Sequence, residues 1–230
     1  MADRDWTRAE RLGAGPFRNG ATGYRDRRST LTRLTAQTGE MVGQPRVGDP
    51  APDFTLPGWY DGEEGMFTLS AERGHPVVLA FYPRDGGAVC TQQLTSYSDE
   101  LAALTASGAR IWAISPQDIA SKATFAGRYG IKLPLLADTG GQVAVRYGLA
   151  DPAAADGAAG TGDVRGTGGA AGARGGSGIG APRRATFVVD AGGTIAWAHM
   201  GTAGSQRFRS AAELAAVLDS LRGGQNSGRP

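Results

Sequence analysis

The sequence predicts an α/β fold, a central mixed sheet flanked by helices. Two observations support this prediction. Patterns typical of strands and of helices alternate between residues 76 and 147, which favours α/β layering with parallel strands. Within that stretch, Pro76–Tyr82 is a nearly continuous apolar run, as expected for a central strand buried on both faces. With 230 residues, 37 of them Gly, we expect one domain with additions, or at most two small domains.

Composition divides the chain into three parts. Residues 1–43 are rich in Arg and lack hydrophobic periodicity, so we expect a disordered or loosely attached basic extension. Three interpretations of this segment stay open: a solvated tail, a basic arm that binds nucleic acid, or residues that precede a true start at Met41. Residues 44–224 form the folded domain, and residues 225–230 a frayed tail. Inside the domain, residues 153–182 carry too little apolar surface to offset their ordering entropy, which predicts a flexible insertion.

The first elements of the domain are strands. Asp53–Leu56 alternates in polarity and Thr68–Ser70 is a second extended piece. Pro76–Tyr82 follows, Pro83 ends it, and Asp85–Gly87 reads as a turn.

Two helices and a strand come next. One helix should begin close to Cys90 and end at Gly108, with apolar positions three and four apart at Leu94, Tyr97, Leu101 and Leu104. Residues 109–114 form a strand. Ser115 should then cap a second helix, with Pro116 at its first position and Asp118 at its third. We expect this helix to end at Tyr129, before Gly130.

The remaining elements are short. Leu133–Leu136 is an apolar segment and Val143–Tyr147 a short helix. Strands over 186–190 and 194–198 flank the turn Ala191–Gly193, which indicates a hairpin. Ser210 and Glu213 have capping-box spacing and open a last helix that Gly223 should end.

Charge and cysteine content exclude several functions. The net charge of +2 makes nucleic acid a poor candidate partner. One Cys excludes an internal disulfide framework, a CxxC dithiol and a Cys-rich zinc site, and two His make a His-based metal site a poor candidate. We therefore expect no metal and no cofactor. A single thiol and the lack of any apolar targeting or spanning segment favour a cytoplasmic location without membrane contact.

The only thiol follows a buried strand, Pro83 and a Gly-containing turn, and it opens a helix. Unpaired N–H groups in a first helical turn carry partial positive charge and stabilise a thiolate. The thiolate is the nucleophilic form of cysteine. The local pattern favours a reactive Cys90, against the alternative of a buried structural cysteine.

Several landmarks in order resemble the peroxiredoxin family. They are Val47–Leu56, Val77–Tyr82 followed by Pro83 and Cys90-Thr91, Ile114–Pro116, Pro134–Asp138 and Arg184–Asp190. Pro83 and Cys90 have the spacing of the family motif Pro-x-x-x-Thr-x-x-Cys. The resemblance covers about residues 45–222 apart from the Gly-rich insertion, and it is strongest to the bacterioferritin comigratory protein type of this AhpC/TSA superfamily.

The resemblance implies a thioredoxin-like fold and a thiol-dependent peroxidase acting on hydrogen peroxide or organic hydroperoxides. Cys90 corresponds to the cysteine that attacks peroxide and becomes a sulfenic acid. Arg184 corresponds to the arginine that faces thiolate and peroxide, whereas Arg183 should point to the other side of the strand. Pro83 would shield the thiolate from water, and the N–H groups of Val89 and Cys90 would bind the developing oxyanion.

Two positions depart from the family pattern. The motif threonine, whose hydroxyl binds thiolate and peroxide, is replaced by Gly87, a loss worth about 10²–10³ in rate unless Thr91 or a water takes over. A resolving cysteine would stand at Thr95. Without it, the cycle needs an external thiol: thioredoxin, a glutaredoxin-like protein or a low-molecular-weight thiol. Family members are monomers or homodimers, and both states stay open.

Two other functions compete with the peroxidase. Gly87 also fits a degenerate site kept as a redox sensor or interaction module. A thiol–disulfide oxidoreductase would need a second cysteine at position 87, where this chain has glycine.

Overall fold

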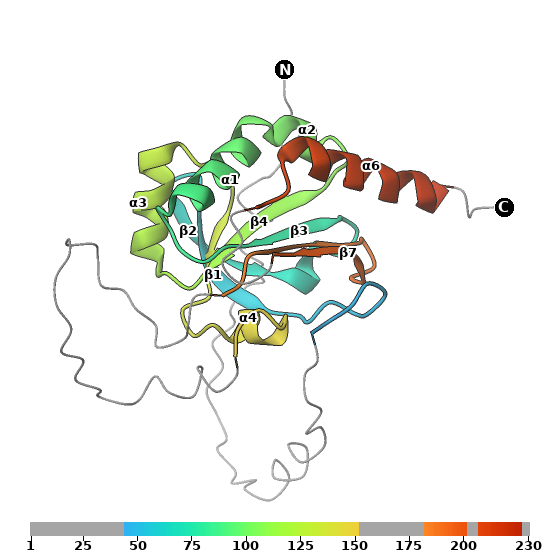
Figure 1. Ribbon diagram of the computed structural model, residues 1–230, viewed down its shortest axis with the longest axis horizontal. Coiled ribbons are helices and arrows are strands. Elements are labelled where there is room, and N and C mark those ends of the chain that lie inside the picture. Colours follow the sequence, from blue (N-terminus) through green and yellow to red (C-terminus); the bar gives the residue numbers. More distant parts are fainter. Residues whose placement is uncertain (1–43, 152–181, 202–206, 227–230) are drawn as a thin grey trace, which may run out of the picture.

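The computed structural model describes residues 44–151, 182–201 and 207–226, and in this part of the chain seven strands form one mixed sheet (Figure 1). Their order across the sheet is β2-β1-β5-β4-β3-β6-β7. Their bounds are β1 Thr55–Tyr60, β2 Glu63–Thr68, β3 Val77–Phe81, β4 Arg110–Ser115, β5 Leu135–Ala137, β6 Ala185–Val189 and β7 Ile195–Met200. Strands β3, β4 and β5 are parallel, and the other pairs are antiparallel.

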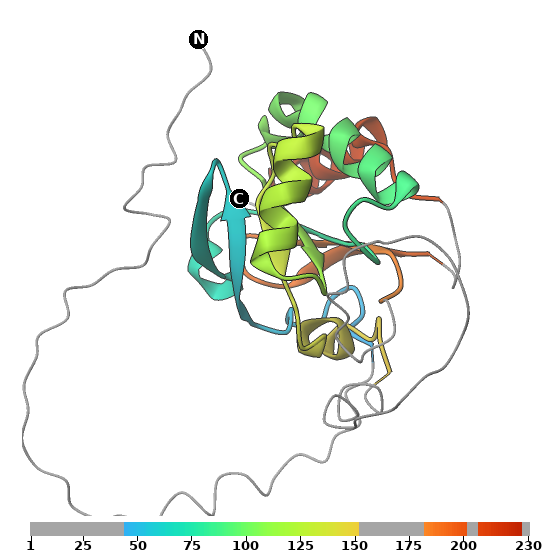
Figure 2. The ribbon, with the colours of Figure 1, turned by 90° about the vertical axis from the view of Figure 1, so that its left-hand side faces the viewer.

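Helices cover both faces of this sheet unequally. They are the 3-10 helix η2 Leu69–Glu72, α1 Ala88–Asp99, α2 Leu101–Thr105, α3 Ile119–Tyr129, α4 Gln142–Arg146 and α6 Ala211–Asn226. Helices α1, α2, α3 and α6 lie on one face, and α4 lies on the other (Figures 1 and 2). The predicted α/β architecture is therefore confirmed.

Strand β3 is an interior strand of the sheet, as its apolar run predicts. All five residues are buried, and alternate side chains enter different layers. Val78 and Ala80 pack with the layer under α1, α3 and α6, whereas Leu79 and Phe81 pack with the layer over α4. The β6–β7 hairpin is also confirmed, with Ala185 of β6 paired to Phe81 at the end of β3.

The prediction of extended backbone over Thr68–Ser70 was right at Thr68 and wrong at Leu69 and Ser70. The structure has instead a hairpin of β1 and β2 that ends at Thr68, and η2 begins at the next residue. The hairpin turns at Asp61 and Gly62, whose φ angles of 53° and 84° are both positive. Such turns favour Asp-Gly because glycine and aspartate tolerate this left-handed backbone better than other residues.

The helix predicted from Cys90 to Gly108 is two helices. The backbone leaves helical geometry at Glu100, with φ −101° and ψ 19°, between α1 and α2. The stripe of apolar positions continues across the break, since Tyr97 and Leu104 are both fully buried. Hydrophobic spacing reports the buried face and does not detect this local kink.

Two helix boundaries also differ from prediction. Asp118, and not Ser115, caps α3, because its carboxylate accepts a hydrogen bond from the Ser121 N–H at 2.9 Å while Ser115 ends strand β4. The capping box of α6 is confirmed, with Ser210 and Glu213 bonded reciprocally, but the helix passes Gly223 and reaches Asn226. Glycine costs a helix about 1 kcal/mol and does not forbid it.

Three predicted segments lie wholly or largely outside the described residues. They are the basic extension over 1–43, the insertion over 153–182 except Pro182, and the frayed tail over 225–230, of which residues 225 and 226 still belong to α6. Among the helices that the structure describes, none combines the length and the apolar character that crossing a membrane requires.

Candidate active site

The lone cysteine lies in the first turn of α1. After β3, the chain passes Pro83 and turns at Gly86, whose φ is 70°. Gly87 follows in extended backbone as the N-cap of α1, and it has no side chain to form a capping hydrogen bond. The first helical hydrogen bond runs from the Thr91 N–H to the Gly87 carbonyl at 2.8 Å. Cys90 therefore belongs to the turn whose N–H groups precede the helical ladder and carry partial positive charge. Its side chain is buried, with 4% exposed.

Arg184 faces this sulfur. It immediately precedes β6, and the pairing of Ala185 with Phe81 places it beside the chain that leaves β3. The Arg184 Nη2 lies 3.2 Å from the Cys90 Sγ, and the guanidinium is buried with 8% of the residue exposed. Arg183 is exposed and donates to the Gly148 carbonyl instead, as strand alternation predicts. The structure thus brings Cys90 and Arg184 together.

Gln93 fixes the other side of the guanidinium. Its Oε1 accepts a close hydrogen bond from Arg184 Nη1, and its Nε2 donates to the Tyr97 hydroxyl at 3.3 Å. That hydroxyl in turn donates to the Arg209 carbonyl at 2.7 Å, just ahead of α6. Burial raises the pKa of Tyr97, which keeps the hydroxyl protonated as a donor. The sequence analysis missed Gln93, and the one signal for it was its spacing of three residues from Cys90, which places both on one helix face.

Two polar atoms at the site are buried without a hydrogen-bond partner among the described residues. They are the Thr91 Oγ1 and the Arg184 Nε. Buried polar groups are usually satisfied, so these two atoms retain hydrogen-bonding capacity next to the sulfur.

The space above Gly87 is open toward the sulfur. A Cβ built there would lie 3.4 Å from the Cys90 Sγ and 3.6 Å from the Arg84 Nε, which is ordinary contact. The φ of −67° and ψ of 137° suit any residue. The backbone at position 87 and the space around it therefore admit a Cβ, and the hydroxyl of the motif threonine is missing.

The other predicted site residues flank the cysteine. Pro83 is half-buried at the start of the loop, and Val89 is half-buried in the first turn of α1. Their proposed contacts with peroxide stay predictions. Thr95, at the position of a resolving cysteine, donates its hydroxyl to the Thr91 carbonyl at 2.9 Å inside α1.

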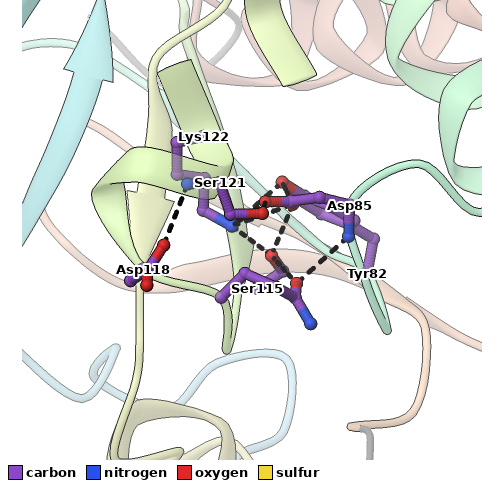
Figure 3. Close-up of polar contacts among 7 residues, drawn as sticks. Tyr82, Asp85, Ser115, Asp118, Ser121 and Lys122 are labelled. Atoms are coloured by element: carbon purple, nitrogen blue, oxygen red, sulfur yellow. Dashed lines mark hydrogen bonds and ion pairs between the residues drawn. The ribbon is translucent and has the colours of Figure 1, made fainter. Parts of the chain in front are cut away.

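A second polar cluster lies behind the loop and was not predicted. Asp85 and Lys122 form an ion pair at 3.0 Å, with 6% and 0% of their side chains exposed (Figure 3). Tyr82, Ser115 and Ser121 all donate hydroxyl hydrogen bonds to the Asp85 carboxylate. Burial lowers the pKa of Lys122 to about 8, and the Asp85 charge opposes that shift.

Among the described residues, no group of three or more His, Cys, Asp or Glu side chains could hold a metal ion.

Comparison with known proteins places this geometry in a family. The AhpC/TSA family profile matches residues 47–198, which include the Cys90 loop and the Arg184 strand. The chain belongs to the AhpC/TSA family.

Relatives in this family carry peroxiredoxin names. A chloroplastic peroxiredoxin Q of Triticum aestivum is 36% identical over 117 residues, 51% of this chain and 52% of its own length. A peroxiredoxin of Coxiella burnetii named bcp is 32% identical over 103 residues, 45% of this chain and 66% of its own. The chain thus spans about half the length of the first of these AhpC/TSA relatives and two thirds of the second. The predicted resemblance to the bacterioferritin comigratory protein type is confirmed.

Solved structures support the fold of this AhpC/TSA member. The crystal structure of peroxidoxin BcpB from Mycobacterium tuberculosis superposes with a TM-score of 0.57, at 24% identity, over 81% of this chain and 99% of that one. At this identity the likeness speaks for the fold, and the predicted thioredoxin-like architecture is confirmed.

Proposed function

We propose that this protein is a thiol-dependent peroxidase with Cys90 as its nucleophile. The observation that carries the proposal is the 3.2 Å contact between Arg184 Nη2 and Cys90 Sγ in the first turn of α1. The guanidinium and the unpaired first-turn N–H groups place positive charge beside the sulfur that would attack the peroxide. Peroxiredoxin names among relatives support the same activity.

The proposed chemistry needs no metal. The Cys90 thiolate attacks one peroxide oxygen, a sulfur–oxygen bond forms and the oxygen–oxygen bond breaks. The departing oxygen leaves as hydroxide or alkoxide and takes a proton, and Cys90 becomes a sulfenic acid. Arg184 and the first-turn N–H groups of α1 would stabilise the negative charge that moves from sulfur to the departing oxygen.

Reduction then depends on a second molecule. An external thiol displaces the sulfenic hydroxyl as water and forms a mixed disulfide with Cys90, and a second thiol releases the Cys90 thiolate. This one-cysteine cycle follows from Thr95 standing where a resolving cysteine would, in a sequence with one Cys. Thioredoxin, a glutaredoxin-like protein or a low-molecular-weight thiol are the proposed reductants. Because the sequence has a single Cys, we also propose that the protein works in a reducing compartment such as the cytoplasm.

A redox sensor is the second candidate, and Gly87 is the observation that favours it. Without the motif hydroxyl, Cys90 could oxidise once and report peroxide without efficient turnover. Both candidates predict sulfenic acid at Cys90 and differ in turnover.

Peroxide consumption with a dithiol reductant tests the proposal. The chain should consume hydrogen peroxide or an organic hydroperoxide over many turnovers, and Cys90→Ser should not. Equal consumption by the two proteins would refute both candidates. One equivalent consumed per chain, with sulfenic acid trapped at Cys90, would instead favour the sensor.

A further inference from the structure

Asp85 belongs to the loop that leads to the cysteine, and its side chain bonds to residues of other elements. It lies between Pro83 and Gly87, and its carboxylate enters the space between the end of β3, the end of β4 and α3 (Figure 3). The loop itself contains Gly86 at φ 70° and Gly87 as a helix cap without a side-chain bond. Glycines constrain a backbone weakly, so the position of this loop depends on what holds Asp85.

The Asp85 carboxylate is held from three elements. Lys122 of α3 donates to both of its oxygens, at 3.0 and 3.3 Å, and Ser121 donates at 2.7 Å. Tyr82, at the end of β3, donates at 2.7 Å, and Ser115, at the end of β4, at 3.0 Å.

Lys122 completes the network from the other side. Its ammonium also donates to the Tyr82 hydroxyl at 3.3 Å and makes a close hydrogen bond to the Ser115 hydroxyl. A buried charge of this kind is stable only while its partner and hydrogen bonds stay in place. Displacing the loop would leave Lys122 buried without its counter-charge.

We propose that the buried Lys122–Asp85 ion pair positions the loop Pro83–Gly87 and thereby holds the first turn of α1, with the Cys90 Sγ, against Arg184. Lys122 is a positioning residue, since it acts through Asp85 and does not contact the sulfur in the structure. The kinetic part of this inference rests on the proposed peroxidase function, whereas the effect on the loop does not.

Titration of Lys122 gives the ion pair a distinctive pH dependence. Burial lowers the pKa of Lys122 to about 8, while Asp85 in the loop, Asp118 at the start of α3 and Asp138 after β5 act in the opposite direction. Tyr82 also faces the ammonium, and its pKa is raised well above the ordinary value by burial, with the charges of Asp85 and Cys90 adding to the shift. Tyr82 therefore stays neutral while Lys122 loses its proton.

The loss of the Lys122 proton should have opposite effects on the loop and on the global stability of the fold. Above pH 8 the folded chain releases the Lys122 proton, whereas the unfolded chain keeps it up to its ordinary pKa of 10.5. The unfolded state then binds more protons, so this group makes the fold more stable as pH rises through that window. The loop should therefore loosen over the same range in which Lys122 adds to global stability.

Amide hydrogen exchange on the full chain tests the positioning directly. The variant Lys122→Met with Asp85→Asn removes both charges and leaves no unpaired buried ion. We expect exchange in residues 84–90, corrected for intrinsic rates, to become about tenfold faster, with β3 and β4 unchanged. Leu218→Ala is the control, because it truncates a buried residue of α6 and should lower global stability without this local acceleration.

Stopped-flow oxidation of Cys90 by hydrogen peroxide is the second readout. The double variant should oxidise about tenfold more slowly, and wild type should slow above pH 8 while its melting temperature does not fall. If wild type does not oxidise at all, the proposed function fails and the exchange result alone decides the positioning. Wild-type exchange and oxidation rates in the double variant would overturn the inference. If that variant does not fold, the wild-type pH series replaces it, and loop exchange that stays constant from pH 7 to 9.5 would overturn the inference equally.

Discussion

The two buried polar clusters beside the Cys90 loop differ in how completely their atoms are satisfied. Around Lys122 and Asp85, both charges are paired and the carboxylate receives hydrogen bonds from three hydroxyl groups. Around Cys90 and Arg184, the guanidinium meets a sulfur and one amide, and its Nε has no partner among the described residues. A saturated cluster holds structure, whereas an unsaturated one has capacity left for a substrate.

The largest effect should come from removing the sulfur of the unsaturated cluster. Cys90→Ser replaces the nucleophile with a hydroxyl that stays protonated at neutral pH, so peroxide consumption should fall to the buffer background. A coupled assay with a dithiol reductant measures it, and circular dichroism checks that the variant folds. Substantial turnover in Cys90→Ser would mean that the chemistry takes place elsewhere.

Arg184→Lys should come next. Lysine keeps the charge but loses the planar fork that contacts both the Cys90 sulfur and the Gln93 amide. Losing one preorganised donor costs about 10²–10³ in rate, so we expect a drop of about 10² in the rate of sulfenic acid formation. The exposed Arg183→Lys is the matched control and should oxidise like wild type. Equal rates in the two variants would show that Arg184 is only a neighbour of the sulfur.

Gly87→Thr should move the rate the other way. A Cβ at this position meets the Cys90 Sγ in ordinary contact at 3.4 Å, and the threonine hydroxyl would supply the missing donor. We expect oxidation to accelerate by up to about 10². Gly87→Ala adds the Cβ without the hydroxyl and should leave the rate near that of wild type. An acceleration shared by both variants would point to backbone stiffening, and no acceleration in either would favour the sensor.

Substitutions in the saturated cluster around Lys122 and Asp85 should change the free energy of unfolding. Lys122→Met alone leaves Asp85 as a buried unpaired charge, and breaking such a pair costs about 3–5 kcal/mol. Adding Asp85→Asn should recover most of that loss, because a neutral pair needs no counter-charge. Urea unfolding at pH 7 measures both variants. A double variant as unstable as the single one would show that the hydrogen bonds, and not the charges, hold this cluster.

The smallest effect is expected at the start of α6. Hydrogen bonds from the Ser210 backbone, with Arg209 adding to them, hold the pKa of Glu213 below its ordinary value. Its contribution is therefore present at neutral pH and is lost as pH falls through that lowered pKa. Glu213→Gln should melt slightly below wild type at pH 7 and closer to it under acid conditions. A pH-independent difference would contradict this.

The sequence predicted the reactive half of this comparison far better than the structural half. Cys90 was predicted from its place at the start of a helix and from family landmarks, and Arg184 from family landmarks and strand alternation. Lys122 and Asp85 are 37 positions apart, on a helix and a loop, and only the tertiary fold brings them together. No local pattern encodes that contact.

The secondary structure also contains elements that the sequence analysis predicted and elements that it missed. The apolar run of β3 predicted a buried strand correctly, since burial on both faces leaves little freedom in composition. The β1–β2 hairpin was missed although Asp61-Gly62 is a strong turn signal. The break at Glu100 could not be found, because the buried face continues across it.

Thr95 has a consequence for how long each molecule survives if Cys90 turns over as proposed. A neighbouring second sulfur would cap the oxidised cysteine at once, whereas here a hydroxyl folded back on α1 occupies that place. The oxidised sulfur must then wait for a thiol from solution, and a second peroxide arriving first converts it to the irreversible sulfinic acid. The working lifetime of the protein would thus depend on the relative rates at which thiol and peroxide react with the oxidised sulfur. Abundant peroxide with scarce thiol would inactivate the protein.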